Sequence, residues 1–179
     1  MGAYLLLLVA VASRFLALPH VAWLNFTAVG GSLLYFGARR RWWEMALPLG
    51  ALMASDYYLT AKVYGYPFHW VDYGTTWIWY LAAMVLGTIL LRTRTTFPRF
   101  ITGVLLGPTS FFIVSNFSVW VGSVMYPHTL GGLMTCYAAG IPFYGNDLLS
   151  TAIVAGLAFG LPEALRRMHL EREAALTGK

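Results

Sequence analysis

The sequence predicts an all-α integral membrane protein, a compact bundle of six transmembrane helices with both termini in the cytoplasm. Three observations lead to this fold class. Hydrophobic residues make up 59% of the chain and charged residues only 11%, which is too little polar surface for a water-soluble domain of 179 residues. The apolar residues form runs, most of them near the ~20 residues that cross ~30 Å of hydrocarbon. Basic residues then occupy alternate gaps between these runs.

The apolar runs define the expected spans of a single domain without internal repeats. They are, in order, 3–19, 27–38, 45–61, 74–91, 100–124 and 147–165. The second run is short and begins with a glycine pair, so we expect this helix to be tilted or bent. Glycines spaced by four, Gly103 with Gly107 and Gly156 with Gly160, predict close helix packing. Residues 166–179 are expected to form a short basic cytoplasmic tail.

The distribution of basic residues predicts the orientation, because cytoplasmic segments of membrane proteins are enriched in Lys and Arg. Ten of the twelve basic residues fall in two connections and the tail: Arg39, Arg40, Arg41, Arg92, Arg94, Arg99, Arg166, Arg167, Arg172 and Lys179. Only Lys62 lies on the other side, and Arg14 lies within the first span. The net charge of +5 is thus spread over three cytoplasmic segments, which argues against nucleic-acid binding.

The connections expected on the outer side are longer and rich in aromatic residues. The longest covers 125–146, and we expect its apolar middle, 130–139, to lie on the membrane as a short helix that acts as a lid. Asn146 and Asp147 suit the amino-terminal capping of the sixth span. A simpler interpretation of the aromatic residues is a belt that anchors the helix ends at the membrane interface.

Polar residues at membrane depth are the first candidates for function. Counting along the helices places Arg14 and Asp56 at similar depth, each about 16 Å from the cytoplasmic start of its span. Such charges are expected to pair, either to fix the helix register or to bind a ligand. Asn116 lies near the outer end of the fifth span with Trp120 one turn later, and its amide suits either a polar solute or an interhelical hydrogen bond.

No metal site and no cofactor are expected. Six possible ligands lie on the outer side: His20, His69, Asp72, His128, Cys136 and Asp147. They belong to separate loops and form no ligand motif such as HExxH or CxxC. The single cysteine excludes an intrachain disulfide and dithiol chemistry, and we expect it to be a small buried residue.

Three segments carry a family resemblance: SRFLALPHVAWLNFTAVGG, ASDYYL and FIVSNFSVWVGSVMYPHTLGGLMTCYAAGIPFYGNDLLS. On these segments, the chain resembles an uncharacterised family of bacterial membrane proteins to which a transport role is attached. The resemblance covers nearly the whole chain. It is also similar in size, span number and topology to the S components of energy-coupling-factor vitamin importers. These components are the subunits that bind the substrate.

The resemblance implies a multi-pass protein of the bacterial cytoplasmic (inner) membrane, in contact with the lipid bilayer. It implies that the bundle captures a vitamin-like organic solute on its outward face. A separate transmembrane scaffold with ATPase subunits would drive release of the solute. The chain itself has no GxxxxGK[ST] motif for ATP hydrolysis.

The main functional hypothesis is therefore a substrate-capturing subunit or small solitary importer, and not an enzyme. Two alternatives stay open: an accessory or structural subunit of a larger membrane complex, which a bundle without an outward cavity would favour, and a small membrane enzyme built on the outer Asp and His residues. The expected substrate site borders one outward-facing pocket. Its residues are Arg14, Asn25, Asp56, Asn116, Trp120, Tyr126, Tyr137 and Asn146, with Trp70 and Tyr73 as the lid.

Overall fold

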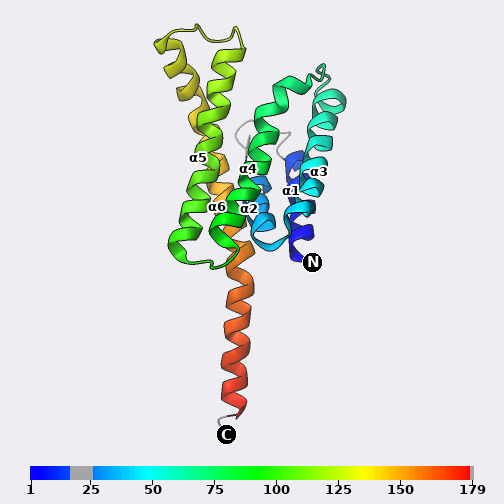
Figure 1. The fold of residues 1–179 in the computed structure, drawn as a ribbon, viewed down its shortest axis with the longest axis vertical. Coiled ribbons are helices and arrows are strands. Elements are labelled where there is room, and N and C mark those ends of the chain that lie inside the picture. Colours follow the sequence, from blue (N-terminus) through cyan, green and yellow to red (C-terminus); the bar gives the residue numbers. More distant parts are fainter. Residues whose placement is uncertain (17–25, 178–179) are drawn as a thin grey trace.

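All regular secondary structure in the described residues, 1–16 and 26–177 of a computed structural model, is helical, and these residues contain no strand (Figure 1). The α-helices are α1 (Gly2–Leu16), α2 (Val29–Arg39), α3 (Ala46–Tyr58), α4 (Gly74–Leu91), α5 (Phe97–Gly122) and α6 (Leu130–Thr177). Short turns of 3₁₀ helix precede α3 (Trp42–Met45) and α4 (Trp70–Tyr73), and a π-helical turn (Leu59–Val63) extends α3. The prediction of an all-α protein is confirmed.

Three helical segments are long and apolar enough to cross a membrane: Trp70–Leu91, Phe97–Gly122 and Leu130–Glu173. Large apolar side chains on these segments point away from the bundle, as with Ile78 at 70% and Leu157 at 61% exposure. In water, the exposure of a continuous apolar surface along all three helices would cost free energy, whereas contact of this surface with lipid hydrocarbon does not. This is the surface expected of a membrane protein.

Helix α2 lies inside the bundle, packed against α1, α4 and α6. Nine of its eleven residues are buried, and they extend over only about 16 Å. Because protein encloses this helix, it has no need of the length that a lipid-facing helix requires. The short second apolar run of the sequence therefore corresponds to the central helix.

The backbones of α2 and α4 are in contact where the two helices cross. A Cβ atom added to Gly37 would overlap the carbonyl group of Met84, and one added to Gly87 would overlap the carbonyl group of Leu34. The Thr88 hydroxyl on α4 donates a hydrogen bond of 2.8 Å to the Gly37 carbonyl. Close approach at small residues is the usual source of helix association in lipid, where the hydrophobic effect is absent.

The glycines predicted to pack closely are different ones. No described atom lies within 4 Å of a Cβ built on Gly107, Gly156 or Gly160, and Gly103 makes only ordinary contacts. That prediction is wrong because the spacing shows which residues share a helix face, but not what this face meets. On the other side of α2, the glycine pair 30–31 does pack closely against α6.

Helix α6 departs most from the expected spans, because it begins at Leu130 instead of 147. The predicted long connection over 125–146 is wrong: α5 and α6 are joined by residues 123–129 only. Thr129 caps α6, since its Oγ1 accepts a hydrogen bond of 3.2 Å from the Gly132 N–H. Residues 130–139 are thus the first turns of a continuous helix and not a separate membrane-lying lid.

The same helix overturns two further expectations. Asn146 and Asp147 lie in its middle, so they do not cap a helix start. Pro142 interrupts the hydrogen-bond ladder of α6 without ending the helix, which neighbouring helices make possible in membrane proteins. The segment 166–177, expected as a tail, continues α6 as a rod beyond the bundle (Figure 1).

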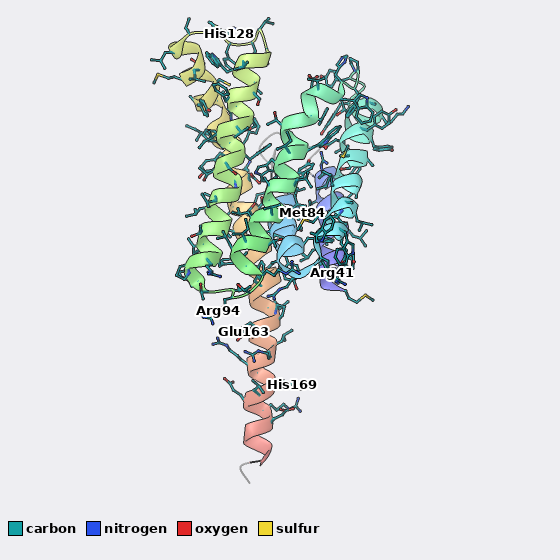
Figure 2. The ribbon with its side chains drawn as sticks, in the orientation of Figure 1. Arg41, Met84, Arg94, His128, Glu163 and His169 are labelled. Carbon is teal, nitrogen blue, oxygen red and sulfur yellow. The ribbon has the colours of Figure 1, made fainter. Side chains whose placement is uncertain are left out.

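The arginine-bearing connections 39–41 and 92–99 lie at one end of the bundle, called here the arginine-rich end. Figure 2 shows Arg41 and Arg94 at this end, where α6 leaves the bundle, and His128 at the opposite end. The Tyr4 hydroxyl donates to Glu44, and Arg40 Nε donates to the same carboxylate at 2.7 Å. These hydrogen bonds hold the pKa of the Glu44 carboxyl below its usual range. They also tie α1 to the connection between α2 and α3.

The contact between α2 and α4 gives a first prediction. Gly37→Ala is expected to lower the free energy of unfolding by about 1–3 kcal/mol, because the added methyl group meets backbone that cannot rotate away. Unfolding in mixed detergent micelles, followed by tryptophan fluorescence, measures the change. Gly156→Ala is the matched control and should leave stability unchanged or slightly higher. Equal losses in the two variants would contradict the backbone contact.

Candidate functional site

A buried ion pair joins α1 to α3. Arg14 Nη2 donates to Asp56 Oδ1, and Arg14 Nη1 donates to the Ser55 hydroxyl at 2.6 Å and to the Leu52 carbonyl at 3.3 Å. The exposed fraction is 16% for the Arg14 side chain and 2% for that of Asp56. The pairing predicted from matched depth is confirmed. The Ser55 hydroxyl in turn donates a hydrogen bond of 2.8 Å to its own helix, at the Leu52 carbonyl.

The second oxygen of Asp56 is held by α4, where Trp77 Nε1 donates a hydrogen bond of 2.9 Å to Oδ2. Trp77 belongs to an aromatic cluster with Tyr57, Phe68, Trp70 and Tyr73. The rings of Phe68 and Tyr73 stack with centroids 4.7 Å apart. This cluster therefore covers one side of the ion pair.

The ion pair borders a cavity of about 250 Å³, called here the central cavity. Its lining residues come from every long helix and from the segment before α2: Arg14, Thr27, Val29, Asp56, Tyr73, Thr76, Trp79, Tyr80, Phe111 and Asp147. Charged groups, hydroxyls and aromatic rings thus face the same space. Such a mixture can orient a small polar solute and give it apolar contact area.

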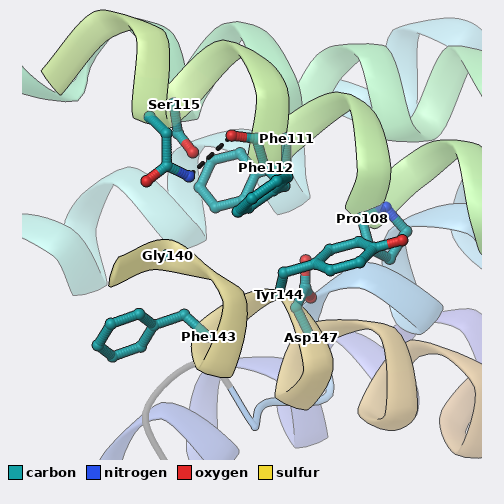
Figure 3. A pocket seen from close by; sticks show the side chains of 9 residues that line it. Pro108, Phe111, Phe112, Ser115, Gly140, Phe143, Tyr144 and Asp147 are labelled. Atoms are coloured by element: carbon teal, nitrogen blue, oxygen red, sulfur yellow. Dashed lines mark hydrogen bonds between the residues drawn. The ribbon is translucent and has the colours of Figure 1, made fainter. Parts of the chain in front are cut away.

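A second cavity of about 190 Å³ lies between α5 and α6 and is called the side cavity. Figure 3 shows the Tyr144 and Asp147 side chains rising from α6 toward Pro108 and Phe112 on α5. The Tyr144 hydroxyl also hydrogen-bonds the Thr109 hydroxyl at 3.0 Å. Phe111 and Asp147 line both cavities, so the two spaces are neighbours.

A larger groove of about 570 Å³ lies between the start of α4 and the end of α5. It shares Thr76 with the central cavity and Ser115 with the side cavity. Its lining is rich in hydroxyls, of which Thr75 and Ser118 form a hydrogen bond of 3.1 Å. Since the arginine-bearing connection joins the other ends of α4 and α5, this groove lies away from the arginine-rich end.

Four of the predicted site residues lie at these spaces. Arg14, Asp56 and Tyr73 line the central cavity, and Asn116 lines the side cavity. Asn116 Nδ2 donates to the Phe112 carbonyl at 2.8 Å, so its amide is partly used within its own helix. The predicted lid residue Trp70 is 63% exposed and packs on the aromatic cluster without lining either cavity.

The other predicted residues are not brought together with the ion pair. Trp120 Nε1 donates to the Pro127 carbonyl at 3.0 Å, and the Tyr137 hydroxyl donates to the Ile113 carbonyl at 2.7 Å. Both contacts join α5 to α6 or to the turn between them, in which Tyr126 is half-buried. Asn146 is half-buried on α6, and Asn25 lies outside the described residues.

Sequence reasoning missed Trp77 and Tyr80, and it considered Asp147 as a helix cap, a possible metal ligand or an acid, but not as a residue of the substrate site. One signal was present for the two aromatic residues. Trp77 and Tyr80 follow the predicted residue Tyr73 at the spacing i, i+4, i+7, which is the spacing of residues on one face of a helix. No comparable signal marks Asp147, because its importance depends on the helices opposite.

The described residues contain no group of three His, Cys, Asp or Glu side chains that could hold a metal ion. Cys136 is buried, as expected, and its thiol donates to the Asn116 carbonyl at 3.3 Å. The thiol thereby helps to fix α6 against α5.

The ion pair gives a second prediction. Asp56→Asn leaves the Arg14 charge buried without a counter-charge, and should cost about 3–5 kcal/mol of unfolding free energy. The double variant Arg14→Met/Asp56→Asn removes both charges and keeps an acceptor for the Trp77 indole. It should therefore be clearly more stable than Asp56→Asn alone in thermal unfolding in lipid nanodiscs. A double variant no more stable than the single one would show that the charges do not stabilise each other.

Comparison with known proteins identifies the family but no characterised relative. The match to the family model covers residues 1–174. No curated protein sequence and no solved structure matches the chain. The chain belongs to a family of unknown function, DUF6580.

Proposed function

We propose that this protein is a membrane transport protein that captures a small organic solute in the central cavity. The observation that carries the proposal is the composition of this cavity, in which one partly buried guanidinium and two buried carboxylates face aromatic side chains. Ionisable groups are costly at membrane depth, and where they occur they usually mark a solute or ion pathway. Concave sites with a few convergent polar groups are also the usual form of small-molecule sites.

The distribution of empty space supports entry from one end. The central cavity shares Thr76 with the hydroxyl-lined groove, which lies away from the arginine-rich end. In the other direction, the contacts of Gly37 and Gly87 close the space between α2 and α4. A solute would therefore reach the ion pair through the groove.

The same proposal includes a topology of six spans with both termini in the cytoplasm of a bacterial cell. In this topology α1, α2 and α3 complete the bundle around the three long helices, and the inner membrane holds the protein with its arginine-rich end inside. The groove then opens to the exterior. This arrangement is the one needed to capture a scarce, vitamin-like micronutrient from outside.

Transport in this proposal requires a partner. The chain has no GxxxxGK[ST] motif, so a separate transmembrane scaffold with ATPase subunits would supply energy, as in importers that use S components. A bundle without cavities would have favoured an accessory subunit instead. The groove and the two cavities support solute capture over that alternative.

The topology can be tested by thiol labelling of intact cells in a Cys136→Ser background. Val124 is fully exposed in the turn between α5 and α6, so a membrane-impermeant maleimide should label Val124→Cys from outside. Arg41→Cys should react only after the membrane is permeabilised. The background variant without an added cysteine is the control. Labelling of the Arg41→Cys protein in intact cells would reverse the proposed orientation.

Solute capture can be tested by native mass spectrometry of protein purified gently in lipid nanodiscs. We expect the wild-type chain to retain a small molecule, and Asp56→Ala to reduce its occupancy at least about tenfold, since the variant loses a hydrogen-bonding group that lines the central cavity. Trp42→Ala, at the arginine-rich end, should retain it fully. Occupancy is compared within the folded fraction of each variant. Equal retention by the two variants, or no bound molecule in the wild type, would contradict the proposed site.

A further inference from the structure

The charges that line the central cavity do not balance among the described residues. Arg14 is engaged by Asp56, Ser55 and the Leu52 carbonyl, so its charge is compensated within the ion pair. Asp147 lines the same cavity, is 7% exposed, and has no basic partner in the described part of the chain. A buried carboxylate is stable only when a cation, hydrogen bonds or a proton compensates its charge.

The Thr151 hydroxyl, one turn further along α6, is the polar group beside Asp147. Thr151 is fully buried, and its Oγ1 and Asp147 Oδ1 both lie within 4 Å of the point where Gly30 would carry a Cβ. A hydroxyl can donate as well as accept, so Thr151 is placed to donate a hydrogen bond to the carboxylate. One neutral hydrogen bond does not compensate the charge of a carboxylate that lines the cavity.

The rest of the lining favours an organic cation over other ligands. Aromatic side chains, among them Trp79, Tyr80 and Phe111, line the same cavity, and aromatic rings attract cations through their π faces. An inorganic metal ion would need several hard ligands, whereas no group of three acidic or metal-binding side chains occurs among the described residues. An anion would meet Asp147, while Arg14 is already occupied by Asp56.

We propose that the solute of the central cavity is a small organic cation whose positively charged nitrogen binds Asp147. This inference rests on the proposed function, and it adds the chemical class of the solute. A cavity of about 250 Å³ has the volume of roughly eight water molecules, which limits the solute to a small molecule unless it extends into the side cavity.

The class of solute can be tested with fractions of a bacterial metabolite extract. The fraction retained by a cation exchanger, the fraction retained by an anion exchanger and the unretained fraction are each incubated with the full chain in lipid nanodiscs. Native mass spectrometry then records any mass added to the protein. We expect added mass with the cation-exchange fraction only.

Two variants link the bound cation to its proposed ligand. Asp147→Asn should weaken binding from the cation-exchange fraction about 10- to 100-fold, the range for hydrogen bonds that involve charged groups. Glu163→Gln makes the corresponding acid-to-amide change on α6 away from the cavities, at a side chain 42% exposed, and should leave binding unaltered. Thr151→Val should weaken binding about fivefold, because it removes the hydroxyl that lies beside the Asp147 carboxylate.

The outcomes separate this inference from the proposed function. Added mass from the anion-exchange or unretained fraction alone would leave solute capture standing and overturn the cationic class. Added mass from none of the fractions would overturn both. Undiminished binding of the cation by Asp147→Asn and Thr151→Val would overturn the assignment of Asp147 as the ligand. Should Asp147→Asn fail to fold, the binding of the cation by Thr151→Val decides the matter.

Discussion

The ion pair between Arg14 and Asp56 is the constraint on which the region around the cavities depends. An unpaired charge is costly in the interior of the bundle, so α1 and α3 meet at this height although 42 residues separate the partners. Ser55 and the Leu52 carbonyl complete the contacts of the guanidinium, and the Trp77 indole completes those of the carboxylate. The last contact places the first turns of α4, with their aromatic residues, beside the pair. One electrostatic requirement thus positions three helices.

The central helix α2 divides the bundle into a packed half and a hollow half. Near the arginine-rich end, Gly37 and Gly87 let the backbones of α2 and α4 touch, and no side chain is needed between them. Toward the other end, large side chains line the central cavity. They are Tyr73, just before α4, Trp79 and Tyr80 on α4, and Phe111 on α5. These large or charged side chains hold the helices apart. Residue size along two helices therefore determines where the empty space lies.

Sequence reasoning predicted best what depends on one helix alone. The expected 74–91 agrees with α4, because this run is apolar throughout and ends at arginine. The ion pair was predictable since depth can be counted along a helix. The start of α6 was not, because GIPFYGN has the residues of a loop, and its helical state depends on neighbours: Gly140 packs against the Asn116 side chain. Asp147 shows the same limit, since the two cavities that it lines are formed together with other helices. Asn25 lies outside the described residues.

The packed half bears on how a captured solute would leave. Side chains that close a passage can open it by changing rotamer within nanoseconds. Here the passage toward the arginine-rich end is closed by backbone against backbone, at Gly37 with Met84 and at Gly87 with Leu34. Such a closure opens only when α2 and α4 move as rigid bodies, or when the whole bundle is reoriented in the membrane. Under the proposed function, release at the arginine-rich end would therefore need work done on entire helices, and this is the role that the proposal gives to an ATP-driven scaffold outside this chain.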